Sequence, residues 1–142
     1  MSPRGGWVLS PHTGGSSIPP SLQHDVRRRI LAYASKKYAG RFSRIDVRFC
    51  GRFCYVDAYR EPDRPSKATL RVLRETERQY YERLRAAPIH LCRLRYFAGH
   101  QRWSLAFYTY SHERYEPTIF PNGEPFGTPE EAFNLCAAIY LT

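Results

Sequence analysis

Apolar and polar residues alternate over residues 44–59, a pattern that is typical of a β-hairpin with one buried face. If Cys50 and Gly51 form the turn, the apolar residues share that face: Phe49, Val47 and Ile45 lie opposite Arg52, Cys54 and Val56. The other face then carries charged and aromatic side chains, namely Arg44, Asp46, Arg48, Phe53, Tyr55, Asp57 and Tyr59. We therefore expect one face to join a core while the other mixes charge with rings.

A second alternating stretch, residues 91–110, predicts another hairpin, because Gly99 and polar neighbours interrupt two apolar runs near residues 98–101. Pairing across a four-residue loop brings apolar pairs onto one face: Tyr96 with Trp103, Leu94 with Leu105, and Cys92 with Phe107. We expect this face in the core, with the C-terminal helix over it. The reverse face would present Arg93, Arg95, Arg102, Tyr108 and Tyr110.

Helical periodicity marks three further segments. Ser21 is the expected N-cap of a helix that continues to about Tyr38, before Gly40 ends it. Residues 66–87 predict a second helix with interspersed Arg and Glu. Thr128 should cap a final helix, with Pro129 at its first position and Glu131 closing a capping box. An extended piece, residues 115–121, and a turn at residues 122–123 precede that last helix.

Together these elements predict an α+β fold: an antiparallel sheet of four to five strands built from two hairpins, with three helices, in the order α-ββ-α-ββ(β)-α. The domain would span residues 18–142. Residues 1–17, rich in Gly, Pro and Ser, would form a disordered arm. Packing of the middle helix decides whether the basic, aromatic sheet face is an open platform or part of the core.

Charge favours an anionic partner. The chain has 19 Arg and 3 Lys against 13 acidic residues, a net charge of +9 that attracts nucleic acid or an anionic surface. The excess of arginine over lysine also fits a GC-rich coding sequence, so charge carries more weight here than arginine chemistry. No apolar run approaches the roughly 20 residues of a membrane span, and no signal peptide is evident. We expect a cytoplasmic protein with no membrane partner.

The four cysteines form no CxxC pair and have no histidine at zinc-finger spacing, so no metal site is expected from them. Cys54, Cys92 and Cys136 each stand among apolar residues, where a reduced thiol behaves as a small core side chain. Cys50 alone is expected at the surface. This pattern fits a reducing compartment.

Candidate catalytic groups are few. Asp46 and Asp57 share the outer side of the first hairpin, a spacing that permits a metal pair. Because Arg44 would lie directly opposite Asp57, cross-strand ion pairing is the simpler interpretation. His112 with Glu113 or Glu116 provides an acid and base pair after a strand, although a polar turn explains the same residues. His90, a lone histidine at a strand start, receives no role. No cofactor motif is present.

The segments DVRFCGRFCYVDAY, LCRLRY, AFYTYSHERYEP and GTPEEAF together resemble a family of short bacterial proteins known as translated open reading frames. The resemblance extends over about residues 18–141. It implies a bacterial, cytosolic origin, and it implies no activity, cofactor or site.

These features favour a small, non-enzymatic nucleic-acid-binding or ribonucleoprotein accessory domain, with DNA or RNA as partner. Its phosphate contacts would be Arg48, Arg93, Arg95 and Arg102, and its stacking rings Tyr55, Tyr108 and Tyr110. The second hypothesis is an accessory subunit whose basic surface docks an acidic protein. The third is a small enzyme that uses His112 and Glu113.

Overall fold

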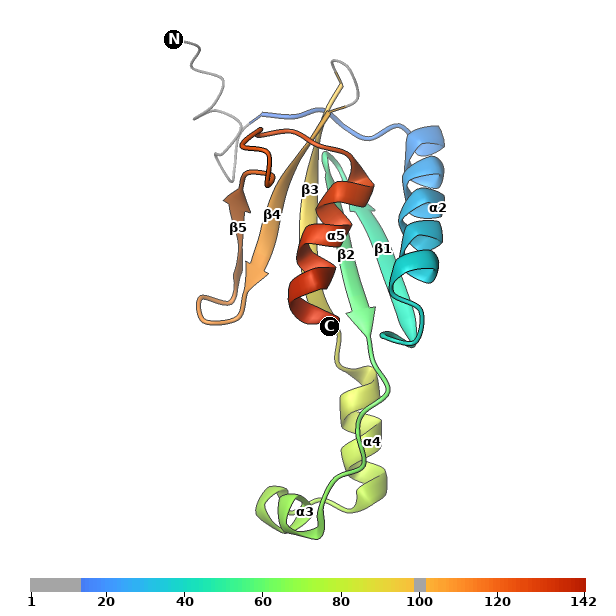
Figure 1. Cartoon of the computed structure of the whole chain (residues 1–142), viewed down its shortest axis with the longest axis vertical. Helices are drawn as coiled ribbons and strands as arrows, with labels where there is room; N and C mark the ends of the chain where they lie inside the picture. The colour runs from blue at the N-terminus through green and yellow to red at the C-terminus, as the bar shows by residue number, and fades with distance from the viewer. Residues whose placement is uncertain (1–13, 99–101) are drawn as a thin grey trace.

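Five antiparallel strands form one open sheet in which every strand pairs with its neighbour in sequence. The structure, a computed structural model, describes residues 14–98 and 102–142. The strands are β1 (Arg44–Cys50), β2 (Phe53–Tyr59), β3 (Ile89–Phe97), β4 (Arg102–Thr109) and β5 (Arg114–Thr118). Helices accompany the sheet, so the α+β fold expected from the sequence is confirmed (Figure 1).

The first hairpin has the predicted faces but a different register. Its two-residue turn is Gly51–Arg52, with Gly51 at φ 60°, a left-handed conformation that suits glycine. Val47 therefore pairs with Val56 and not with Cys54. This shift by two residues keeps every side chain on its expected face, because side chains alternate with a period of two. Asp57 consequently lies opposite Asp46, not opposite Arg44 as expected.

The second hairpin pairs as predicted. Cys92 lies opposite Phe107, Leu94 opposite Leu105, and Tyr96 opposite Trp103. Its expected turn falls largely on residues 99–101, outside the described residues. The extended piece after it becomes β5, which pairs with β4, and Gly123 adopts φ 85° in the turn that follows.

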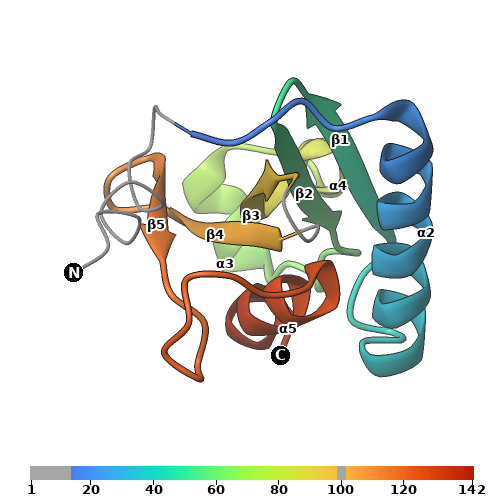
Figure 2. The same cartoon turned by 90° about the horizontal axis from the view of Figure 1, so that it is seen from above.

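Helices α2 (Pro20–Lys37) and α5 (Pro129–Tyr140) pack on one side of the sheet, α5 over β3 and β4, and α2 beside β1 (Figures 1 and 2). Helix α2 begins one residue before Ser21, with Pro19 at the N-cap position, so Ser21 is not the cap. The predicted capping box of Thr128 and Glu131 is present in α5. Between these helices and the sheet lies the core, which includes Val26, Ile30, Val47, Val56, Leu94, Trp103, Leu105 and Phe133.

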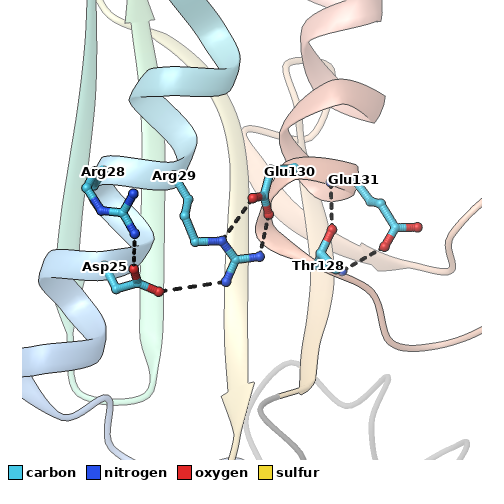
Figure 3. Close-up of polar contacts among 6 residues, drawn as sticks. All are labelled: Asp25, Arg28, Arg29, Thr128, Glu130 and Glu131. Atoms are coloured by element: carbon cyan, nitrogen blue, oxygen red, sulfur yellow. Dashed lines mark hydrogen bonds and ion pairs between the residues drawn. The ribbon is translucent and has the colours of Figure 1, made fainter.

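An ion pair joins the two packed helices. The guanidinium of Arg29 in α2 donates from Nε and Nη2 to the carboxylate of Glu130, at 2.9 and 2.6 Å (Figure 3). Glu130 lies in the first turn of α5, where the helix dipole also favours a negative charge. Asp25 extends the network through Arg28 and Arg29. The bidentate geometry fixes how α2 and α5 meet.

The expected middle helix is two helices, so the described structure has four helices and not three. Helix α3 (Lys67–Leu73) ends at Arg74, whose φ is 54°, and α4 (Glu77–Ala86) begins at a capping box formed by Thr76 and Gln79. Both helices extend beyond one end of the sheet as a helical arm (Figure 1). Among the described residues, neither α3 nor α4 has a buried side chain.

Residues before α2 also contact the sheet. The expected disordered arm, residues 1–17, lies mostly outside the described residues, but residues 14–17 are placed. The Ser16 N–H donates to the Tyr96 carbonyl at 2.8 Å, and the Arg52 guanidinium donates to the Gly14 carbonyl. Within the described residues, no helix is both long and apolar enough to span a bilayer.

Candidate nucleic-acid interface

One face of the sheet is not covered by α2 or α5, and we call it the outer face. The helical arm extends past its end and does not lie across it (Figure 1). The side chains that strand register places there include Arg48, Phe53, Tyr55, Asp57, His90, Arg93, Arg95, Tyr108 and Tyr115. Most of the residues predicted for binding therefore gather on this face, with charges and rings interleaved.

Arginine side chains on the outer face stack against aromatic rings. The Arg93 guanidinium lies 4.4 Å from the ring centroid of Phe53 and 5.7 Å from that of Tyr115, and Arg48 lies 5.4 Å from that of Tyr55. A guanidinium attracted to a ring face can still offer N–H groups to phosphate oxygens. The arrangement therefore places cations beside rings at fixed positions.

Two of the predicted phosphate contacts, Arg95 and Arg102, lie in environments that differ from those of Arg48 and Arg93. Arg95 is only 3% exposed, and burial together with the nearby Arg93 and Arg52 lowers its pKa. Its side chain lies between Phe53 and Phe97 and supports the aromatic surface from within. Arg102 is exposed at the start of β4, with its guanidinium 4.3 Å from the Phe126 ring centroid. Arg93 and Arg48 are thus the central cations of the outer face.

Asp57 is a buried carboxylate in β2, and two side chains on the outer face satisfy it. Arg48 donates to Asp57 Oδ2 at 2.8 Å, and His90 Nδ1 lies 2.9 Å from Asp57 Oδ1. Burial alone would lower the pKa of Arg48, but the charge and hydrogen bond of Asp57, together with the charge of Asp46, outweigh burial and raise that pKa. Arg48 also contacts Asp46, so a guanidinium separates the two aspartates. Among the described residues no group of three or more metal ligands is present.

His90 is a site residue that the sequence interpretation missed. A register shift between Val56 and Asp57 leaves Leu91 unpaired in β3 and brings His90 opposite Asp57. Strict alternation back from Arg93 would have placed His90 on the core face. In the sequence, the signal for this bulge is that Leu91 and Cys92 are consecutive apolar residues, which breaks the alternation. Both are buried in the structure.

Three tyrosines surround the imidazole of His90. The ring centroids of Tyr108, Tyr110 and Tyr115 lie 4.7, 6.5 and 6.4 Å from that of His90. The Tyr110 hydroxyl accepts the His90 backbone N–H, and the Tyr140 hydroxyl of α5 donates to the Tyr108 carbonyl at 2.6 Å. Burial and the charge of Asp57 raise the pKa of Tyr115, so its phenol stays protonated. We call Asp57, His90, Tyr108, Tyr110 and Tyr115 the His90 site.

A hollow of about 610 Å³ adjoins the His90 site. It is lined by Arg93, by Tyr108 and by residues 113–117, which include Tyr115. This volume lies within the range of small-ligand pockets, and the hollow is open to solvent. It is large enough to seat a nucleotide beside Arg93.

Of the two carboxylates considered from the sequence as partners of His112, the structure pairs it with Glu116 and not with Glu113. His112 Nδ1 pairs with Glu116, and this hydrogen bond lowers the pKa of Glu116. Glu113 occupies the turn between β4 and β5 with φ 52°. His112 is more than half exposed. Its arrangement is that of a surface turn, as the simpler interpretation expects.

The cysteines also fit the pattern inferred from the sequence. Cys54, Cys92 and Cys136 are buried, and Cys50 is exposed. Burial raises the pKa of Cys54 to about 12. A thiol that stays protonated is a poor nucleophile, so Cys54 serves the core.

No family model, curated protein or solved structure matches this chain, so function is inferred from the geometry of the outer face itself. The resemblance to short bacterial proteins stays an expectation from the sequence.

Proposed function

We propose that the outer face binds single-stranded nucleic acid. The observation that carries this proposal is the interleaving of arginines and rings on a sheet face that α2 and α5 leave open, with Arg93 between Phe53 and Tyr115. Arginines would contact phosphates, while rings such as Tyr108 and Tyr55 offer surfaces on which bases stack. The net charge of +9 supports the same choice through long-range attraction.

Salt dependence tests the phosphate contacts. Binding of a labelled single strand should weaken as salt rises, with a slope of log K against log salt of about −0.7 for each phosphate contact. Arg93→Ala should make the slope shallower by about one such contact. Arg28→Ala is the matched control, because Arg28 is an exposed arginine of α2, on the opposite side of the sheet. An equal change of slope in both variants would contradict the proposal.

Stacking is tested at Tyr108. Tyr108→Ala should weaken single-strand binding by about 1 to 3 kcal/mol with little change in the salt slope, whereas Tyr108→Phe keeps the ring and should bind nearly as well. Circular dichroism of both variants shows whether the fold is retained. If the wild-type protein binds neither DNA nor RNA at low salt and tens of micromolar, the proposal is wrong. An acidic protein partner is then the hypothesis to pursue.

A further inference from the structure

We propose that the outer face also cleaves the RNA it binds, with His90 as the general base that activates a ribose 2′-hydroxyl. The inference deepens the proposed function and rests on it, because the strand must first lie on the outer face. The geometry of the His90 site carries this inference: Asp57 contacts Nδ1 of the imidazole, and Nε2 is left available.

The carboxylate of Asp57 fixes the tautomer of His90. Asp57 is 3% exposed and already paired with Arg48, so its Oδ1 is an acceptor for the N–H at His90 Nδ1, 2.9 Å away. When Nδ1 carries the proton, Nε2 of the neutral ring carries a lone pair. Within the described residues, Nε2 makes no hydrogen bond, and the His90 side chain is 32% exposed. A carboxylate that orients a partly exposed imidazole is the arrangement that general-base catalysis uses.

The surroundings of His90 suit a nucleotide. The ring centroids of Tyr108 and Tyr115 lie 4.7 and 6.4 Å from that of His90, and these two tyrosines also line the hollow together with Arg93. A base seated on these rings would place its ribose near Nε2, and Arg93 would contact the adjoining phosphate. Glu116 also lines the hollow, but its carboxylate is engaged by His112 and Arg114. Both the position of the sugar and the neutralisation of the phosphate therefore come from side chains already in place.

The reaction is an internal transesterification. His90 Nε2 takes the proton of the 2′-hydroxyl, the 2′-oxygen bonds to phosphorus, and the bond between phosphorus and the 5′-oxygen breaks. The leaving 5′-oxygen takes a proton from water, and the imidazolium returns its proton to the hydroxide so formed. The products are a 2′,3′-cyclic phosphate and a 5′-hydroxyl. DNA, which lacks the 2′-hydroxyl, should bind without being cut.

The test uses end-labelled single-stranded RNA of mixed sequence and the same RNA with every ribose 2′-O-methylated. Wild-type protein should cut only the unmodified RNA and leave cyclic phosphate ends. His90→Ala should slow cleavage at least 100-fold, as loss of a general base does, while its Kd for the RNA stays within about threefold. His24→Ala, prepared in parallel, is the matched control and should cleave at the wild-type rate, because His24 is an exposed histidine of α2, on the opposite side of the sheet. Asp57→Asn changes the positioning group, and should lower the cleavage rate more than RNA affinity.

Failure of this inference is distinguishable from failure of the proposed function. RNA that is bound but not cut by the wild-type protein overturns the cleavage proposal and leaves binding intact. Equal cleavage by wild type and His90→Ala also overturns it, because the activity then comes from another source. Absence of binding to either RNA overturns both proposals. His90 is partly exposed and lies at a strand start, so His90→Ala should keep the fold. The melting curve of this variant shows whether a loss of cleavage comes from a loss of fold.

Discussion

Leu105 lies near the centre of the sheet, where β4 faces the helical layer. Its side chain is 2% exposed and lies opposite Leu94 of β3. A buried leucine in such a position contributes both its transfer out of water and its packing contacts. Individual core residues of this kind, and not the charges of the outer face, are expected to determine the free energy of unfolding.

We expect Leu105→Ala to lower the free energy of unfolding by about 2 to 5 kcal/mol, since it removes buried methyl groups and leaves a cavity. Leu31→Ala is the matched control, because Leu31 in α2 is 38% exposed and should cost well under half as much. Urea denaturation of both variants measures the difference. A loss below about 0.5 kcal/mol for Leu105→Ala would contradict the observed register.

At the scale of elements, the junction of α2 and α5 depends on pH. Burial alone would raise the pKa of Glu130, but the hydrogen bonds from Arg29 and from the backbone outweigh it, so the pKa lies below its ordinary value. Because the folded state binds this proton less readily than the unfolded state, ionised Glu130 stabilises the fold above about pH 4.3. That contribution is lost as pH falls through the lowered pKa.

Glu130→Gln should therefore lower stability at pH 7 by about 1 kcal/mol, a value discounted because both side chains are nearly a third exposed. As pH falls through the lowered pKa of Glu130, the variant and the wild type should converge. Thermal melts between pH 3 and pH 7 measure this. Glu82→Gln on α4 is the control, since its exposed pair with Arg78 should have little effect at any pH. A difference that persisted unchanged into acid would show that the ion pair is not responsible.

Elements with a local cause could be predicted from the sequence. Alternation identified which face of each hairpin is buried, and Thr128 with Glu131 identified the start of α5. Features that depend on competition between local signals could not be predicted from the sequence. Gly51 alone did not fix the hairpin turn, and the cap at Thr76 divides a helix whose periodicity is continuous. The bulge at Leu91 decides that His90 joins the outer face, so this part of the site required the structure.

At the scale of the whole molecule, the helical arm is an insertion into a hairpin. Strands β2 and β3 pair directly up to Ala58 and Ile89, so the two ends of the arm lie close together. Its ion pair between Arg85 and Glu61 is exposed, and none of the described side chains of α3 and α4 is buried. The sheet and its two packed helices therefore contain the core without help from the arm.

Replacing residues 61–87 by a short Gly-Ser linker should leave the sheet folded and shift Tm by only a few degrees, the equivalent of about 1 kcal/mol. The shortened protein should also keep the near-ultraviolet circular dichroism of Trp103, which lies in the core. Scrambling the arm sequence at constant length is the control for linker entropy. Unfolding of the shortened protein would mean that the arm supports the sheet.

The pairing of every strand with its sequence neighbour has a consequence for how the chain folds. Apart from β2 and β3, which the helical arm separates, strand contacts form across short loops, which favours rapid closure. The contact of Arg29 with Glu130, by comparison, spans 101 residues. The sheet can thus assemble before its apolar face is covered. Because α5 is translated after all five strands, that face stays exposed to other chains until α5 docks, and this interval is when aggregation competes with folding.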